Sequence, residues 1–219
     1  MFTLYSADFT GNPGNCSYPH KTVVMNTDNL REAVCHDYVC AEYKNHYRNG
    51  ENFISADCLP VDCDNDHSED PNDWVTPADV LEAFPGVSIA IHYSRFNNRE
   101  KNGKPARPKF HVLFPIDRMT DATLYSDMKK LVNSIFPYFD TKALDAARFF
   151  FGTQEPNVEL YPGRMNLTEF FNDDEFDAGL PGGHEKDAVI PEGSRNAVMS
   201  RFAGIVIKKY GDSEKAYQS

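Results

Sequence analysis

The sequence lacks the features of a membrane or secreted protein. None of its 219 residues belongs to a run of about 18 apolar residues, so we expect no membrane-spanning helix. The opening MFTLYSADFT has no basic segment followed by an apolar one, so we expect no signal peptide. The five cysteines are odd in number, and their spacing resembles no secreted disulfide framework. We therefore expect a cytoplasmic protein with reduced thiols.

Basic charge is also scarce. The net charge is −11, which is not typical of a protein that binds nucleic acid through its overall charge. Internal repeats and low-complexity segments are absent as well. The hydrophobic content of 41%, with 16 Phe and 11 Tyr, is enough for a sizeable core. This length and composition favour one large domain, or one domain with appendages.

The first 50 residues read as an accessory α/β element. Residues 1–25 are polar and interrupted by GNPGN and YPH, which predicts an opening strand followed by a loop. Residues 28–47 carry apolar side chains at helical spacing, with Asp28 available as the N-cap. The apolar positions of this predicted helix are Leu30, Val34, Tyr38, Val39 and Tyr43.

The following segments alternate between strand and helix patterns. Strands are predicted at 53–64, 87–94, 109–116, 147–151 and 157–161, and helices at 76–84 and 120–136. Thr76, Pro77 and Asp79 form a strong helix start, and Pro137 ends the second helix. This β-α-β-β-α-β order predicts an α+β fold with an RRM-like or ferredoxin-like split β-α-β sheet, in which the first and third strands are central neighbours.

The chain divides into three parts by composition. Residues 1–171 are predicted to form one domain, with the accessory element at 1–50 and an RRM-like core at 51–171. Residues 172–193 are rich in glycine, proline and acids and indicate a linker. Residues 194–219 are predicted to form a closing helical segment.

Two acids stand where the first core strand ends, in LPVDCDND. Asp62 and Asp64 share one face of a strand, while Val61 and Cys63 share the other and are expected to be buried. The acids would then lie on the exposed face, where carboxylates roughly 7 Å apart repel each other. They are either solvated at a strand end or ligands for a hard divalent cation such as Mg²⁺ or Mn²⁺.

The third core strand would bring further charge to the same face. In KFHVLFPI, Lys109 and His111 alternate with apolar residues, and Arg107 precedes them. Because the first and third strands are expected to be neighbours, His111 would lie beside Asp62 and Asp64. Carboxylates that bind metal, next to cations that bind phosphate oxygens, suit a metal-bound polyphosphate.

The loop before this strand is strongly basic. Residues 95–109 carry six basic residues and one acid, Glu100. This loop is either a solvated hairpin tip or a mobile arm that contacts nucleic-acid phosphates. The basic residues are Arg95, Arg99, Lys101, Lys104, Arg107 and Lys109.

A third carboxylate could come from FDTKALDAARFFFG. Asp140 follows the second helix, and Asp145 lies three residues before Arg148. Either acid would complete a three-carboxylate site for two metal ions. The alternative for Asp145 is a surface ion pair with Arg148, which would stabilise little.

These motifs resemble the archaeo-eukaryotic primase superfamily, the primase-polymerases. VDCD is similar to its D-x-D/E strand end, KFH matches its histidine strand in part, and Phe139-Asp140 followed by DAAR matches its third motif. RPKFHVLFPI and LDAARFFFG look most like domains of phages, plasmids and integrated elements. The resemblance covers roughly residues 50–155, and GSRNAVMSRFAG resembles the start of the region after such domains.

The resemblance implies template-directed nucleotidyl transfer on single-stranded DNA with two Mg²⁺ or Mn²⁺ ions. Asp62, Asp64 and Asp140 would be metal ligands, with Asp145 as the alternative to Asp140, and His111 would contact the incoming NTP or dNTP. We further assign Arg107, Lys109 and Arg148 to the nucleotide, and Arg95, Arg99, Lys101 and Lys104 to nucleic acid.

The same resemblance implies a setting for the protein. It suggests a role in replicating a mobile element in a bacterial or phage-infected cell, with a helicase in a longer chain or as a separate protein. The sequence departs from the family at Lys109, where a small residue is common, and at FGTQEPN, where glycine and lysine are common. Both departures concern the contacts to the triphosphate.

Two other functions are compatible with the predicted sheet. A replication-initiator endonuclease would need paired histidines around one metal and a nucleophilic tyrosine, and the seven histidines are scattered along the sequence. A non-catalytic RRM-like single-strand binder would need exposed aromatic residues on the sheet. A requirement for Mn²⁺ or Mg²⁺ separates such a binder from an enzyme.

The cysteines do not indicate zinc. Cys35 and Cys40, like Cys58 and Cys63, are five residues apart, whereas zinc sites usually have closer pairs. Cys58 and Cys63 would also face opposite sides of one strand. We expect buried free thiols.

Overall fold

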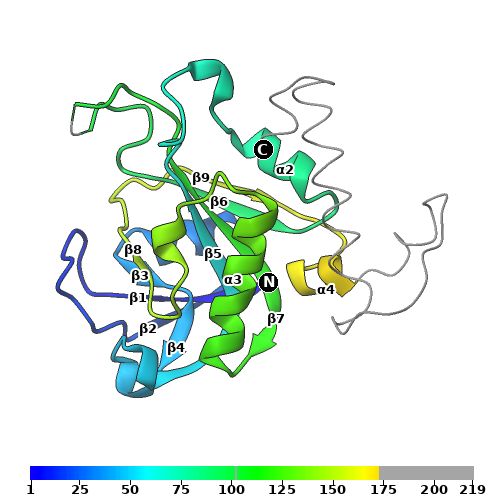
Figure 1. Ribbon diagram of the computed structural model, residues 1–219. Coiled ribbons are helices and arrows are strands. Elements are labelled where there is room, and N and C mark those ends of the chain that lie inside the picture. Colours follow the sequence, from blue (N-terminus) through cyan, green and yellow to red (C-terminus); the bar gives the residue numbers. More distant parts are fainter. Residues whose placement is uncertain (102, 173–219) are drawn as a thin grey trace, which may run out of the picture.

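The computed structural model describes residues 1–101 and 103–172. It is an α+β protein with two antiparallel sheets (Figure 1), a four-stranded one of order β2-β1-β3-β8 and a five-stranded one of order β4-β5-β7-β6-β9. The strands are β1 (Phe2–Ser6), β2 (His20–Val24), β3 (Tyr38–Val39), β4 (Ala41–Tyr43), β5 (Phe53–Cys63), β6 (Ile89–Tyr93), β7 (Phe110–Met119), β8 (Phe149–Phe150) and β9 (Val158–Tyr161). The helices are α1 (Thr27–Val34), α2 (Pro77–Ala83), α3 (Ala122–Ile135) and α4 (Leu167–Asn172).

The centre of the five-stranded sheet follows the predicted strand order. β5, β6 and β7 are the first three predicted core strands, and β7 lies between the other two, antiparallel to both. The expected adjacency of the first and third strands is therefore confirmed. Helix α2 begins as predicted, because the N–H and hydroxyl groups of Thr76 both donate to Asp79 Oδ2 at 2.8 Å. Helix α3 ends at Ile135, two residues before Pro137.

Both faces of this sheet are buried. One face packs against the helices, where Val61 and Val112 lie in one apolar cluster with Phe136. Figure 1 shows α3 lying across this face. The other face packs against the four-stranded sheet and α1 in a second cluster, which contains Cys58, Leu113, Ala90, Leu30 and Phe150. The prediction that the acids lie on an exposed face is therefore wrong, because the N-terminal strands cover that face.

The predicted helix at 28–47 is correct only in its first part. Helix α1 ends at Val34, and its N-cap is Asn26, whose side chain accepts from the Asn29 N–H at 2.9 Å, rather than Asp28. The short strands β3 and β4 follow instead, because β3 pairs with the distant strands β1 and β8, and β4 pairs with β5. Two further elements differ from the prediction: β2 lies in the polar opening segment, where a loop is expected, and α4 lies at the end of the described chain, where no helix is expected.

The predicted fourth core strand joins the other sheet. β8 pairs with β3, whereas β4 from the N-terminal segment occupies the position next to β5. The predicted strand at 157–161 is β9, at the β6 edge. Strands are thus exchanged in both directions between the segments 1–50 and 51–171.

Two residues close to β3 and β8 fix this exchange. The buried carboxylate of Asp37 accepts hydrogen bonds from the N–H groups of Gly11, Asn12 and Gly152, the last at 3.0 Å. A Cβ atom at Gly152 would lie 2.1 Å from the carbonyl oxygen of His36, so this close approach requires glycine. The segment after β8 is consequently held against the N-terminal sheet.

Two predicted segments lie outside the described residues, namely the linker from 173 onward and the closing helix at 194–219. Among the helices of residues 1–101 and 103–172, none has both the length and the apolar character needed to cross a bilayer.

Candidate active site

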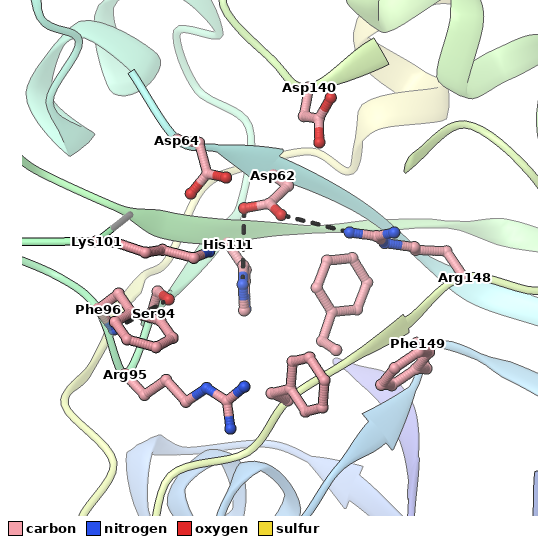
Figure 2. A pocket seen from close by; sticks show the side chains of 12 residues that line it. Asp62, Asp64, Ser94, Arg95, Phe96, Lys101, His111, Asp140, Arg148 and Phe149 are labelled. Atoms are coloured by element: carbon pink, nitrogen blue, oxygen red, sulfur yellow. Dashed lines mark hydrogen bonds and ion pairs between the residues drawn. The ribbon is translucent and has the colours of Figure 1, made fainter. Parts of the chain in front are cut away.

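Three carboxylates meet at the end of β5. Asp62 lies in the strand, Asp64 directly follows it, and Asp140 follows α3; their oxygen atoms lie within 4.8 Å of one another. Figure 2 shows the three side chains above the central sheet strands. The N–H of Asp140 donates to the carbonyl oxygen of Asp62 at 2.7 Å, which fixes the loop after α3 to the strand end. The structure therefore brings together the three acids that the sequence analysis considers as metal ligands, and their role as ligands stays a prediction.

Asp62 is the most perturbed of the three acids. Its side chain is buried, and its Oδ1 atom has no hydrogen-bond partner in the described part of the chain. Burial raises the pKa of Asp62 to about 7, the negative charges of Asp64 and Asp140 add to this effect, and Arg148 and Lys109 oppose it. A carboxylate that has lost its water and repels two others is suited to a cation.

The donor set fits a hard divalent ion. All three residues offer carboxylate oxygens, which are the ligands that Mg²⁺ and Mn²⁺ prefer. The partnerless Oδ1 atom of Asp62 is a buried acceptor that such an ion would satisfy. The identity of the ion stays a prediction.

His111 lies directly opposite Asp62 in the pairing of β5 with β7. Its Nε2 atom is 3.6 Å from Asp62 Oδ1 (Figure 2). Burial lowers the pKa of His111 to about 3; Arg148 and Lys101 also lower it, and Asp64 opposes them. His111 is therefore neutral at pH 7 and can donate from only one ring nitrogen.

A buried hydrogen-bond chain lies beneath His111. The hydroxyl oxygen of Tyr38 is 3.0 Å from His92 Nδ1 and 3.2 Å from His111 Nδ1, and His92 Nε2 is 3.2 Å from the hydroxyl of Thr153. A tyrosine hydroxyl has one proton, so it donates to one histidine and accepts from the other. When it donates to His111, the His111 proton is on Nε2 and faces the carboxylates.

Neither His92 nor Tyr38 is marked as a site residue by the sequence alone. His92 lies opposite His111 in the pairing of β6 with β7, so alignment of the two predicted strands could have found it. Tyr38 had been placed in a helix, which hid its position in β3.

A cavity of about 340 Å³, hereafter the larger cavity, opens beside the carboxylates. Figure 2 shows Arg95 at its far end from Asp140, with Lys101 and Arg148 on opposite sides. The Nη2 atom of Arg148 is 3.7 Å from Asp62 Oδ2, and its Nε atom is buried without a partner in the described structure. The other lining residues are Asp62, Asp64, Ser94, Phe96, His111, Phe149, Phe150 and Phe151.

The larger cavity therefore combines three carboxylates with three cations and an aromatic wall. The guanidinium carbon of Arg95 lies 4.1 Å from the centroid of the Phe151 ring, a cation–π contact that holds Arg95 on this wall. Such a lining suits a ligand with a phosphate chain at one end and a flat ring at the other.

Two residues that we assigned to the nucleotide lie elsewhere. Lys109 is buried, and its Nζ atom contacts the carbonyl and the carboxylate of Asp64 at 2.9 and 3.0 Å. Arg107 is also buried, donates to the carbonyl of Asn65 at 2.8 Å and lies over the Trp74 ring. Both side chains neutralise the loop after β5 rather than lining the larger cavity.

The basic loop is only partly directed to the cavity. Arg95 and Lys101 line it, whereas the Nζ atom of Lys104 pairs with Asp66 at 3.0 Å and Arg99 is exposed. The loop thus contributes two of the four cations that we assigned to nucleic acid.

Asp140, and not Asp145, lies with the other two acids. Asp145 is exposed, its carboxylate accepts from the Ala147 N–H at 2.7 Å, and its carbonyl accepts from Lys129 Nζ at 2.8 Å. Arg148 pairs with Asp62. The loop contacts of Asp145 therefore hold the segment that leads to Arg148.

The five cysteines are free thiols. Cys40, Cys58 and Cys63 are buried as expected, while Cys16 and Cys35 are partly exposed. Burial raises the pKa of Cys58 and of Cys63, so both are neutral at pH 7.

Asp62→Asn is expected to raise the melting temperature of the metal-free protein at pH 8. The folded-state pKa of about 7 lies above the ordinary 3.8, so ionisation of Asp62 destabilises the fold as the pH rises. Asparagine removes this cost, and each kcal/mol gained corresponds to about 2–4 °C. The measurement is thermal unfolding with a chelator at several pH values.

The gain should disappear below about pH 4, where the carboxyl group is protonated in both states. An Asp62→Asn protein that melts at the wild-type temperature or lower at pH 8 would contradict the burial argument. Asp127→Asn, at an exposed acid on α3, is the control and should show no such gain.

Comparisons with known proteins give a distant likeness. No family model and no curated protein matches the chain. Among solved structures, the AEP domain of the cyanophage S-2L primase-polymerase (PrimPol) is similar over 74% of this chain and 81% of that domain, with 12% identity and a TM-score of 0.42. At that identity and TM-score the likeness does not assign the chain to a family, so membership of the primase superfamily stays a prediction.

Proposed function

We propose that this protein is a metal-dependent nucleotidyltransferase that joins nucleotides on a single-stranded DNA template. The observation that carries the proposal is the group of three carboxylates, with oxygens within 4.8 Å, at the edge of a cavity that also holds three cations. Carboxylates bind the metal ions and cations bind phosphate oxygens, which is the division of charge that a metal–triphosphate complex requires.

Each residue has a role that follows from its position. Asp62, Asp64 and Asp140 would hold two Mg²⁺ or Mn²⁺ ions, which supply charge neutralisation and a more acidic attacking hydroxyl. Arg148 has a buried Nε–H without a partner among the described residues and would donate it to a phosphate oxygen. His111 would donate its Nε2–H to the triphosphate. The chain otherwise acts by positioning and electrostatics.

Two histidines are paired in the structure, which is one requirement of the endonuclease alternative. The histidines are scattered along the sequence, but the rings of His92 and His111 lie 5.2 Å apart in space and Tyr38 contacts both, so the fold forms a pair that the sequence does not reveal. However, Tyr38 is fully buried and burial raises its pKa well above 10, so it cannot serve as a nucleophile. The two Nε2 atoms also have different partners, Thr153 and Asp62, which does not suit one shared metal.

Aromatic residues do line the site, as the single-strand binder would require. Phe96, Phe149 and Phe151 belong to the lining of the larger cavity. They are arranged next to the carboxylates, so the aromatic wall is equally suited to the base of a nucleotide whose phosphates approach the acids.

Incubation with single-stranded template and labelled nucleotides tests the proposal. The reaction should contain Mn²⁺ or Mg²⁺, with and without primer, and both NTPs and dNTPs. Metal-dependent incorporation of label supports the proposal. Template binding without incorporation, unaffected by a chelator, would favour the single-strand binder.

His111→Ala is expected to raise the nucleotide KM more than it weakens template binding. His111 faces the cavity but adds no ligand to the carboxylate group, so Mn²⁺ affinity should change little. Tyr38→Phe should also raise the nucleotide KM, by roughly five- to thirtyfold, because it leaves the buried Nδ1 atoms of His92 and His111 without a partner. Steady-state kinetics and titrations of nucleotide and template measure both effects.

The control is Tyr47→Phe, at an exposed tyrosine, which should behave as wild type. Unchanged nucleotide affinity together with lost template affinity in His111→Ala would mean that the role of His111 is misassigned.

A further inference from the structure

A second cavity, hereafter the smaller cavity, lies beside the same carboxylates. Its volume is about 240 Å³, and it is formed between the loop after β5 and the segment after α3. Asp64 and Asp140 line both cavities. Metal ions held by these two acids would therefore be next to both cavities.

The two cavities differ in charge. The larger cavity balances three carboxylates with Arg95, Lys101 and Arg148. The smaller cavity also has three carboxylates, but Lys142 is its only lysine or arginine among the described residues. Asp64 and Asp66 are already paired with Lys109 and Lys104, which do not line the smaller cavity, so few cations are available there for phosphate oxygens. A triphosphate is therefore favoured in the larger cavity, whereas a neutral ribose hydroxyl needs no such cations.

The smaller cavity also has an aromatic surface. The rings of His67 and Tyr138 lie 4.9 Å apart at an interplanar angle of 54°. His67 is exposed and is held in place by its Nε2–H, which donates to the carbonyl of Asp73 at 2.9 Å. Tyr138 packs on Phe136 at 5.1 Å, which ties it to the core. Aromatic side chains are surfaces on which nucleic-acid bases stack.

We propose that the smaller cavity binds the attacking nucleotide, with its 3′-hydroxyl towards Asp64 and Asp140 and its base against His67 and Tyr138. This inference rests on the proposed nucleotidyl transfer. The ligand is the 3′ end of a primer, or a first nucleotide when synthesis begins. Phosphoryl transfer requires the attacking and leaving oxygens to be roughly in line. Two cavities that share two carboxylates offer each of these oxygens a separate place next to the same two acids.

Nucleotidyl transfer across the two cavities would form one phosphorus–oxygen bond and break another. The 3′-oxygen forms a bond to the α-phosphorus of the triphosphate in the larger cavity. The bond from that phosphorus to the α–β bridging oxygen breaks, and pyrophosphate leaves with the electron pair. The proton of the 3′-hydroxyl passes to water. No oxidant or further reactant is required.

A primer with 2-aminopurine as its 3′-terminal base tests the assignment. The fluorescence of 2-aminopurine falls when the base stacks, and with Mn²⁺ but no triphosphate no reaction can occur. We expect quenching with wild type, and about tenfold weaker binding of the primer end by His67→Ala and Tyr138→Leu. The affinity for a triphosphate alone should be unchanged in both variants. Tyr47→Leu, at an exposed tyrosine outside both cavities, is the control.

His67 is exposed, so His67→Ala should fold even where Tyr138→Leu does not. Wild-type quenching and affinity in His67→Ala, or no quenching by the wild-type protein, would overturn the inference. If His67→Ala and Tyr138→Leu lost affinity for the triphosphate rather than for the primer end, the roles of the two cavities would be reversed. That result would overturn the inference as well. Wild-type incorporation with unaltered primer binding by the variants refutes only this inference. Quenching that depends on His67, without any incorporation, refutes only the proposed function.

Discussion

Asp62→Asn and Asp64→Asn should each lower nucleotide incorporation by roughly a thousandfold or more. Loss of one carboxylate from a two-metal site removes several kcal/mol of charge stabilisation, and about 4 kcal/mol corresponds to a thousandfold in rate. Both variants should remain folded, because asparagine has a similar shape and can still accept a hydrogen bond from Lys109 at position 64. Single-turnover extension of a labelled primer measures the rate.

Binding of Mn²⁺, followed by titration calorimetry, separates a lost ligand from a lost fold. Asp127→Asn is the matched control, since Asp127 is an exposed acid on α3 that pairs with Lys130 at 2.8 Å. It should keep wild-type activity and Mn²⁺ affinity. Wild-type polymerisation by either Asp62→Asn or Asp64→Asn would refute the metal site.

Asp140→Asn and Asp145→Asn should differ by about a hundredfold or more in activity. Of these two acids, only Asp140 belongs to the group whose oxygens lie within 4.8 Å of one another, so only its loss would remove a ligand of the proposed metal site. Each asparagine can still accept the local N–H bond that the aspartate accepts, from Lys142 for residue 140 and from Ala147 for residue 145. The two substitutions thus alter the same loop by the same chemical change.

Mn²⁺ titration is again the direct measurement. Asp145→Asn should bind the ion as wild type does and retain activity to within a few fold. Equal losses of activity in both variants would mean that the substitutions act by disturbing the loop and not by removing a metal ligand. Loss confined to Asp145→Asn would transfer the third ligand to that residue.

The local sequence pattern is enough to predict the central strands β5 and β7 of the sheet and the acids Asp62 and Asp64 at the end of β5. Alternating apolar residues define β5 and β7, and their pairing places His111 opposite Asp62 as expected. A motif and the position after the second predicted helix favour Asp140 as the third acid. The hydrogen bond from the Asp140 N–H to the Asp62 carbonyl explains why this position lies next to the strand end. These features depend on neighbours in the sequence or on one strand pairing.

The remaining features depend on contacts that no local pattern contains. Tyr38 has a spacing that suits a helix, whereas its pairing with Ser6 and Phe150 makes it part of a strand, and its bonds to two histidines place it beneath the site. Arg107 and Lys109 looked like ligands for phosphate because their charge is visible in the sequence. Their carbonyl and carboxylate partners in the loop after β5 are visible only in three dimensions.

The exchange of β4 and β8 has a consequence for how the chain folds. The five-stranded sheet is incomplete without residues 41–43 and the four-stranded sheet without residues 149–150, so each sheet depends on a strand from the other half of the chain, and many native contacts are distant in sequence. High contact order slows folding, because loop-closure entropy is lost before these contacts form. A polypeptide beginning at residue 51 would also leave the edge of β5 unpaired and expose Cys58, Leu113 and Phe150 to water. An open strand edge next to an apolar surface promotes aggregation, so the first 50 residues belong to the folding unit.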